Sequence, residues 1–186
     1  MILRILATIP NLHMYFKSDM VMLRPLEAED LDLLYQWENN PTVWEVSHTL
    51  SPYSKFVLQQ YLDQSQLDIY TTKQLRLVIM DIENNKPVGL VDFFDFDPFH
   101  MRTGIGVLIA QESDRRKGFA KEAIRLMLKY ASKHLKLNQV YCNIAANNLS
   151  SLNLFEQLGF HKVGVKQQWL NTADGYQDEY LLQLIF

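Results

Sequence analysis

Residues 104–120 read GIGVLIAQESDRRKGFA and hold the most informative pattern in the chain. The apolar run 104–110 predicts a β-strand, and residues 118–134 carry apolar side chains at helical spacing. A short basic loop, residues 115–117, joins the two and ends at Gly118. Backbone N–H groups at a helix start have no partner within the helix, and the helix dipole favours negative charge there. The stretch therefore predicts a cradle for a phosphate group, which Gly118 allows to approach the backbone closely.

Two common phosphate-binding motifs do not fit this loop. A Walker A loop has Ser or Thr directly after a Gly-Lys pair, and a dinucleotide fingerprint has three glycines at fixed spacing. Neither pattern is present around Gly118. On spacing alone, a basic surface loop that only caps the following helix remains the alternative to a ligand site.

Outward from this stretch, strands and helices mix along the whole chain without a linker or a repeat. Pro25 ends the first predicted strand, Pro41 ends the first helix, and Gly159 is a C-terminal helix cap. Residues 42–53 are predicted as an irregular loop. The predicted strands are 21–24, 75–82, 88–96, 104–110, 140–145, 163–169 and 180–186, and the predicted helices are 27–40, 54–68, 118–134 and 150–158. This order indicates one α/β domain with a mixed sheet.

Three motifs in this order resemble the GNAT acetyltransferase superfamily. Arg115-x-x-Gly118-x-Ala120 after a strand looks like that superfamily's acetyl-CoA pyrophosphate loop. A second motif, similar to its downstream helix and Gly-Phe pair, is Asn148-x-x-Ser151-x-x-x-Phe155-x-x-x-Gly159-Phe160. The opening Leu23-Arg24-Pro25-Leu26 with Glu29-Asp30-Leu31 resembles its first strand and helix.

These motifs are most similar to those of the spermidine and diamine N-acetyltransferases and of the ribosomal-protein-alanine acetyltransferases. The resemblance implies a single-domain GNAT fold of the α/β class, with a mixed, mostly antiparallel sheet and flanking helices. That domain would span residues 21–186. Residues 1–20 are then expected to be a leader or extension without an assigned function, since Pro10 and Asn11 interrupt the apolar run that a signal peptide would need.

The resemblance also implies acetyl-CoA as the acetyl donor. The main chain of residues 107–109 would pair with the pantetheine arm as an added strand, and the amides of residues 116–120 would hold the pyrophosphate. Asn148 would bond to pantetheine or to a water bound there. The residues expected at the cofactor are Val107, Leu108, Ile109, Arg115, Arg116, Lys117, Gly118, Phe119, Ala120, Asn148, Ser151 and Phe155.

Acetyl transfer to an amine requires a neutral nitrogen. An alkylamine has a pKa near ~10.4, so removing its proton at pH 7 costs about 4–5 kcal/mol. A carboxylate can accept that proton and can attract a cationic substrate. Asp92, Asp95 and Asp97 lie on a strand expected beside the cofactor strand. Because the polyamine enzymes have a glutamate at the position aligned with Asp95, we expect Asp95 to be the general base or amine anchor. Asp92 is expected to bind substrate, and a solvated strand edge is the alternative for both.

One departure from the resemblance concerns the leaving thiolate. The family has a tyrosine seven residues after the motif asparagine to protonate it, and this chain has Phe155 there. A phenyl ring cannot donate a proton, so water or another hydroxyl must do so, and Ser151 and Tyr141 are the candidates. Phe155 itself is expected to pack against the thioester.

A second departure concerns the acceptor. The polyamine enzymes have an acidic pair just before a Pro-Tyr between the first two helices, and this chain has Leu50-Ser51 before Pro52-Tyr53. Trp44 and Glu45 are expected to contact the acceptor, and packing between helices is the alternative for Trp44.

Composition limits the partners. The chain has 186 residues, with 18 Lys and Arg against 21 Asp and Glu and a net charge of −3, so nucleic acid is not an expected partner. One cysteine, Cys142, excludes an internal disulfide and a multi-cysteine zinc site. No cluster of His, Asp or Glu has metal-ligand spacing, and no stretch approaches the ~18 apolar residues of a membrane span. We therefore expect a cytoplasmic protein without a metal or a membrane partner.

The expected function is acetyl-CoA-dependent N-acetyl transfer by direct attack of a primary amine, with a polyamine or diamine among the candidates. One alternative acceptor is the N-terminal amine of a protein or peptide. An alternative of another class is a non-catalytic CoA-binding sensor or assembly module, which Phe155 favours. A homo-oligomer is also an open expectation.

Overall fold

The computed structural model describes residues 13–47, 49–65 and 67–186. In chain order the elements are α2 (His13–Phe16), β1 (Val21–Pro25), η1 (Ala28–Asp30), α3 (Leu31–Glu38), α4 (Pro41–Ser47), α5 (Lys55–Gln64), α6 (Ile69–Thr72), β2 (Leu75–Asp81), β3 (Lys86–Asp97), β4 (Arg102–Ile109), η2 (Glu112–Asp114), α7 (Phe119–Lys133), β5 (Gln139–Ala145), α8 (Leu149–Gln157), β6 (His161–Thr172) and β7 (Gly175–Ile185). Within these residues no helix is both long enough and apolar enough to cross a membrane.

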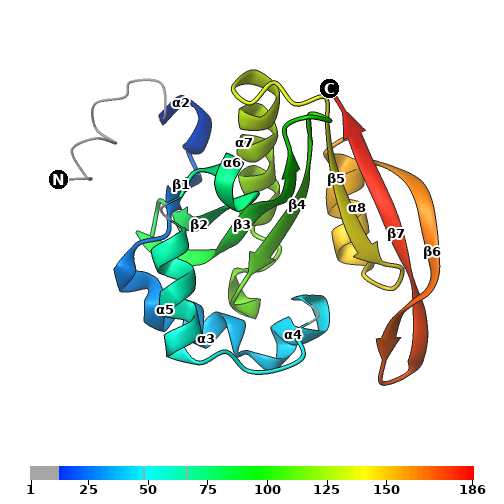
Figure 1. The fold of residues 1–186 in the computed structure, drawn as a ribbon, viewed down its shortest axis with the longest axis horizontal. Coiled ribbons are helices and arrows are strands. Elements are labelled where there is room, and N and C mark those ends of the chain that lie inside the picture. The colour runs from blue at the N-terminus through cyan, green and yellow to red at the C-terminus, as the bar shows by residue number, and fades with distance from the viewer. Residues whose placement is uncertain (1–12, 48, 66) are drawn as a thin grey trace.

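The strands form one seven-stranded sheet in the order β1-β2-β3-β4-β5-β7-β6 (Figure 1). Every neighbouring pair is antiparallel except β4 and β5, which run parallel. A parallel pair needs a crossover connection, and α7 supplies it between β4 and β5. The mixed, mostly antiparallel sheet predicted from the resemblance is therefore confirmed.

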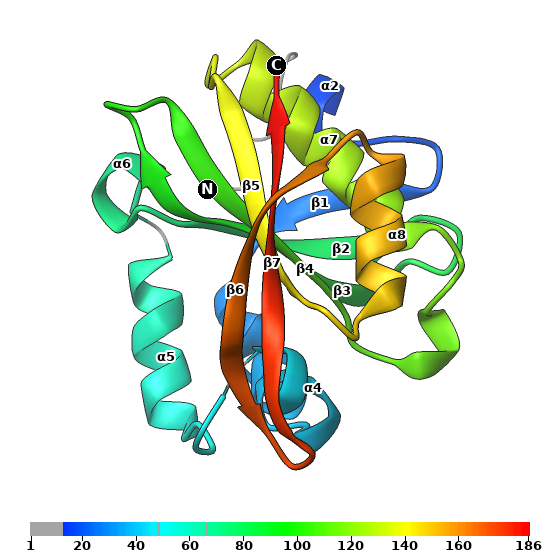
Figure 2. The same cartoon turned by 90° about the vertical axis from the view of Figure 1, so that its right-hand side faces the viewer.

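Two apolar cores lie on the two faces of the sheet. On β2, Leu77 and Ile79 belong to the core under α7, whereas Val78 between them belongs to the core under α3 and α5. Successive side chains of a strand point to opposite faces, so a strand that is buried on both sides reads as a continuous apolar run. Figure 2 shows α7 and α8 on one side of the sheet and α5 on the other.

The prediction of an irregular loop over residues 42–53 is wrong in its first part, because α4 occupies Pro41–Ser47. The sequence pattern predicts Pro41 only as the end of the preceding helix. Proline also suits the first turn of a helix, where its missing N–H costs nothing. Asn40 caps this helix, since its Oδ1 accepts from the backbone N of Thr42 at 3.1 Å. The same residues therefore end α3 and begin α4.

Several predicted boundaries also shift. The helix predicted over 27–40 is a 3-10 turn, η1, followed by α3, and the one predicted over 54–68 ends at Gln64. The strands of the C-terminal hairpin, β6 and β7, are longer than predicted and reach the turn at Gly175. Residues 13–20 lie outside the predicted domain but contact it: the Phe16 ring is 4.8 Å from that of Tyr130 on α7.

Candidate functional site

The two parallel strands diverge after a short contact. β4 and β5 pair only at Arg102–Gln139, Thr103–Val140 and Gly104–Tyr141, although both strands continue beyond these pairs (Figure 1). The rest of β4 pairs with β3 alone, from Gly104 opposite Phe94 to Ile109 opposite Gly89. One backbone edge of β4 therefore faces an opening between the strands, and we call the last pair, Gly104–Tyr141, the apex of this opening.

Alternation along β4 determines which backbone groups face the opening. The Ala110 N–H donates to Val88 O on the β3 side at 3.0 Å. In an antiparallel ladder, alternate residues bond the same neighbour, so Leu108 also faces β3, whereas Val107 and Ile109 face the opening. Arg115 Nε donates to Ile109 O at 3.4 Å, from the open side. Of the three residues predicted to pair with an extended ligand, Val107 and Ile109 therefore present their main chain and Leu108 does not.

The N-terminus of α7 offers unpaired backbone donors next to this edge. Its N-cap is Gly118, with φ +93°, and no side chain caps the helix. The first intrahelical bond runs from Glu122 N to Gly118 O, so the amides of Phe119, Ala120 and Lys121 have no partner within the helix. A residue without a side chain, at a helix start to which no side chain is hydrogen-bonded, suits an anion, and the neighbouring side chain is the apolar Met20, whose Sδ would lie 3.5 Å from a Cβ placed on Gly118. The predicted cradle has the donor set of a phosphate site.

Not all of the predicted basic charge is directed at that site. Lys117 Nζ lies 2.9 Å from Asp114 Oδ1, and Lys86 Nζ lies 2.9 Å from Asp114 Oδ2. Only 3% of the Asp114 side chain is exposed, and the hydrogen bonds from Lys86 and then Lys117 lower its pKa. Asp114 therefore holds Lys117 on its own side of the loop, while Arg115 and Arg116 are exposed.

Asp114→Asn is expected to reduce the free energy of unfolding at neutral pH by about 1–3 kcal/mol, because it leaves two lysines without their buried partner. The folded-state pKa of Asp114 is lowered, so its charge stabilises the protein above about pH 4 and that contribution is lost as the pH falls through the folded-state pKa. The difference in melting temperature between wild type and variant should therefore be largest near neutral pH and shrink in acid. Thermal denaturation across a pH series measures this, with the exposed Asp63→Asn as control. A difference that stays constant across the series would contradict it.

The other wall of the opening is the start of α8. Asn148 is its N-cap and its Oδ1 accepts from the backbone N of Ser151 at 3.1 Å, which leaves the Asn148 amide NH2 as the donor for a ligand. Phe155 is 4% exposed and packs edge to face on Phe160, with ring centroids 5.0 Å apart. The Phe155 ring is thus part of the core, and its predicted contact with a thioester stays a prediction.

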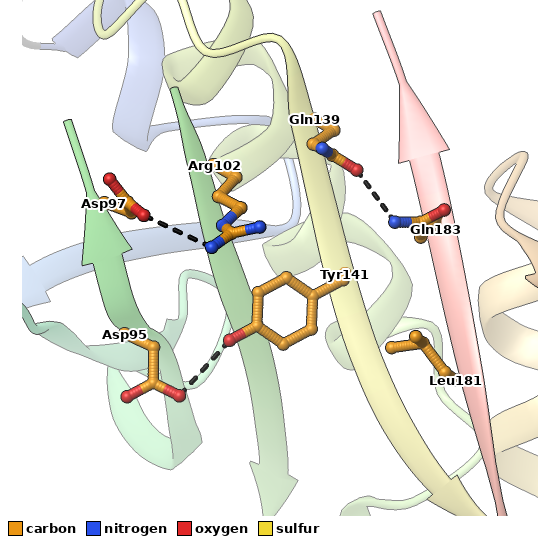
Figure 3. Close-up of a pocket in the computed structure, with 7 residues that line it drawn as sticks. All are labelled: Asp95, Asp97, Arg102, Gln139, Tyr141, Leu181 and Gln183. Carbon is orange, nitrogen blue, oxygen red and sulfur yellow. Dashed lines mark hydrogen bonds and ion pairs between the residues drawn. The ribbon is translucent and has the colours of Figure 1, made fainter. Parts of the chain in front are cut away.

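A cavity of about 450 Å³ lies at the apex (Figure 3). It is lined by Asp95, Asp97, Arg102, Gln139, Tyr141, Leu181 and Gln183. Asp95 has φ +49° at a register shift of β3 between Phe94 and Asp97, and such a bulge re-aims the side chain. Tyr141 reaches from β5 to Asp95, and its hydroxyl donates to Asp95 Oδ2 at 3.2 Å. This pair lies 46 residues apart in sequence, so no local pattern could have predicted it.

Asp92 lies in a different environment. Its Oδ1 is 3.5 Å from Arg76 Nε, and Arg76 Nη1 donates to Glu38 Oε1 at 2.8 Å. Burial raises the pKa of Asp92 while the Arg76 charge opposes that rise. A Cβ placed on Gly106 of β4 would lie 3.5 Å from Asp92 Oδ2, so the carboxylate lies next to β4. Asp92 is therefore near the predicted site but already paired, through a contact with Arg76 that the sequence did not indicate.

A second cavity, of about 280 Å³, lies between α3 and α5 and is lined by Leu34, Glu38, Thr49, Tyr53, Val57, Leu58, Tyr61 and Arg76. Trp44 of α4 donates from its Nε1 to the Glu38 backbone O at 2.7 Å, which is the packing role left open for it. The Glu45 side chain lies outside the described residues, so its predicted contact with an acceptor is not addressed. Both acceptor roles stay predictions.

Comparison with known proteins agrees with this geometry. A family model described as acetyltransferase (GNAT) domain matches residues 21–161. The spermidine N(1)-acetyltransferase of Escherichia coli is 30% identical over 172 residues, which cover 88% of this chain and 89% of that protein. The crystal structure of spermidine N-acetyltransferase from Vibrio cholerae in complex with CoA and spermine is similar with a TM-score of 0.80 at 24% identity, over 90% of this chain and 96% of that one.

A further structure of the Vibrio cholerae enzyme is described as dodecameric, and it matches with a TM-score of 0.75 at 23% identity, over 90% of this chain and 95% of that one. The homo-oligomer expected from the sequence stays a prediction for this chain. Exposed apolar side chains on the β6–β7 hairpin, at Val163, Val165, Trp169 and Tyr176, agree with that prediction.

Proposed function

The chain belongs to the acetyltransferase (GNAT) domain family, and we propose that it transfers the acetyl group of acetyl-CoA to a primary amine that enters the apical cavity. The observation that carries this proposal is the joint placement of three features. They are a strand edge that loses its partner after Gly104, a helix start at Gly118 without a side-chain cap, and a cavity with Asp95 where the strand edge begins.

The donor set fits acetyl-CoA. The pantetheine arm carries amide groups, which can pair with the main chain of Val107 and Ile109 as an added strand would. The diphosphate can bond to the amides of Phe119 and Ala120 at the α7 N-terminus. Bound acetyl-CoA supplies an activated thioester; binding, orientation and proton transfer are left to the protein. The apex is where the two strands come together, so an acyl group at the end of the arm would lie next to Asp95.

Asp95 is the proposed base. Its carboxylate lines the cavity together with that of Asp97. The one cationic side chain of the lining is Arg102, which lies 3.3 Å from Asp97. The lining therefore has one net negative charge, which favours an ammonium group over an anion. Once Asp95 has accepted its proton, the nitrogen has the lone pair that attack on the thioester requires.

A polyamine is the first acceptor to test, because the relatives in Escherichia coli and Vibrio cholerae carry spermidine acetyltransferase names. The side-chain charges around the second cavity of this chain favour a polycation less than the names of those relatives suggest. Arg76 lines the second cavity, pairs with Glu38 and lies beside Asp92. Its positive charge offsets one of the two carboxylates, so the three side chains together carry one net negative charge. We therefore propose that one ammonium binds at the apex and that the rest of the acceptor meets few unpaired carboxylates.

The test is an acceptor screen that measures thiol release from acetyl-CoA. The panel contains spermidine, a diaminoalkane, an arylalkylamine and a peptide with a free N-terminus. We expect release with at least one of the small amines and acetylated amine as the product by mass spectrometry. Release with the peptide alone would mean that the acceptor is a protein N-terminus and not a small amine. CoA binding without release for any amine would support the non-catalytic module, which the Phe155 position favours.

A further inference from the structure

Among the described residues, Tyr141 has the only side-chain hydroxyl that lines the apical cavity. It also lies at the apex, and its hydroxyl is hydrogen-bonded to the Asp95 carboxylate. It is the β5 residue opposite Gly104, the last β4 residue that pairs with β5. Its neighbours Val140 and Cys142 point into the core under α7, so the Tyr141 ring points to the other face, where the cavity lies. An edge-to-face contact with Phe94, at 5.9 Å and 85°, fixes the ring.

We propose that Tyr141 is the catalytic acid that protonates the leaving sulfur of coenzyme A, and that Asp95 and Tyr141 form a proton-carrying pair. This inference rests on the proposed function. The Tyr141 Oη and Asp95 Oδ2 atoms are 3.2 Å apart, so a proton can pass between them without an intervening group. The same cavity opens on both groups, so an amine and the sulfur can each reach one member of the pair.

The other candidate donors are placed less well. The Phe155 ring has no proton to give and is packed on Phe160 in the core. Ser151 lies in the first turn of α8, where its amide bonds the capping Asn148 side chain. Cys142 points into the core, and burial raises its pKa to about 12. Among these side chains only Tyr141 lines the apical cavity.

Burial, and then the Asp95 charge, raise the pKa of Tyr141 to about 12, so the hydroxyl keeps its proton at physiological pH. A thiol has a pKa near ~8.5, so transfer from Tyr141 alone would be unfavourable by a factor of roughly 3000. Asp95 removes this difficulty. After Asp95 has accepted the amine proton, it becomes a donor to the Tyr141 oxygen, and the Tyr141 proton is free to turn toward the sulfur. The tyrosine then regains a proton from Asp95 as it gives its own away.

The protons and electron pairs of the reaction balance when one proton is released to solvent. The amine nitrogen forms a bond to the acyl carbon with its lone pair, and the carbon–sulfur bond breaks with its electron pair on sulfur. An ammonium loses two protons on its way to an amide: Asp95 accepts the first, which frees the lone pair, and passes it to solvent, and Asp95 accepts the second once the nitrogen–carbon bond has formed. The Tyr141 proton then passes to sulfur, and the second proton passes from Asp95 to the Tyr141 oxygen. The products are an N-acetylated amine, a free thiol and one proton in solvent, and both side chains return to their starting protonation states.

The test compares Tyr141→Phe with Tyr176→Phe, a control at an exposed tyrosine on the β6–β7 hairpin. We expect Tyr141→Phe to lower kcat about a hundredfold or more, with a Kd for CoA within about twofold of wild type. The second readout is the pKa of the CoA thiol in its complex with the protein, followed by thiolate absorbance. A hydrogen bond donated to a thiolate stabilises it, so Tyr141→Phe should raise that pKa, and Tyr176→Phe should not.

The outcomes separate this inference from the proposed function. A kcat near wild type for Tyr141→Phe, with CoA bound normally, would overturn the assignment of Tyr141 and leave the acetyltransferase function intact. A lower kcat with an unchanged thiol pKa would also overturn it, since Tyr141 would then act only on the shape of the cavity. Failure of the wild-type protein to bind CoA would remove both proposals together.

Discussion

Gly118→Asp is expected to abolish binding of CoA and of acetyl-CoA, with an affinity loss of at least about a hundredfold, or about 2.7 kcal/mol. Two effects act in the same direction. The φ of +93° at Gly118 lies in a region that residues with a Cβ rarely adopt, at a cost of roughly 1–2 kcal/mol. The new carboxylate would also stand at the helix start, where the α7 amides are expected to receive the diphosphate, and would repel it.

Isothermal titration calorimetry with CoA measures this affinity, and a melting curve shows whether the variant is folded. Gly175→Asp is a matched control. Gly175 also has a positive φ, +107°, and a Cβ there would meet nothing within 4 Å. It lies in the β6–β7 turn, so this control carries the same strain and the same charge away from α7. Equal CoA affinity for both variants and wild type would mean that the α7 N-terminus does not hold the diphosphate.

The Gly118 loop could be predicted because its signal is local. A strand, a basic loop with one glycine and a helix follow one another within about thirty residues, and each part has its own hydrophobic period. The seven strands were predicted for the same reason. What local patterns could not show is the length over which β4 and β5 stay paired, because pairing between strands about forty residues apart is set by the tertiary fold and not by a local period. The resemblance to a known family implied only that the main chain of residues 107–109 pairs with a ligand, and the register shows that the β4–β5 pairing ends at Gly104.

The charged contacts were the least predictable part of the site. Asp114 bonds Lys86 from 28 residues away, Arg76 bonds Glu38 from 38 residues away, and Tyr141 bonds Asp95 from 46 residues away. In the sequence, Asp92, Asp95 and Asp97 are three similar carboxylates on one strand. The fold distinguishes them: the bulge after Phe94 directs Asp95 into the cavity, while Asp92 is left beside Arg76. Contacts of this kind join residues far apart in sequence, so no period or spacing in the sequence predicts them.

Asp95→Asn is expected to lower kcat by about 10²- to 10³-fold while the Kd for CoA stays within about twofold, because an amide cannot accept the proton of the attacking amine. The fold should tolerate the change, since Asn adopts the φ of +49° as readily as Asp does. Tyr141 can still donate to the Asn oxygen, so the cavity keeps its shape. Steady-state kinetics with the best acceptor from the screen, together with calorimetry for CoA, measure both quantities.

Asp97→Asn provides the control, because it removes the same charge from the same cavity. Asp97 Oδ1 accepts from the amides of Phe99 and His100, and an asparagine oxygen can keep both bonds. If attraction of the ammonium were the whole contribution of these carboxylates, the two variants would raise the KM of the amine equally and leave kcat alone. A base at Asp95 predicts instead that only Asp95→Asn lowers kcat. Equal kinetics for the two variants would therefore remove Asp95 from the proton transfer, and with it the partner that Tyr141 needs to regain its proton.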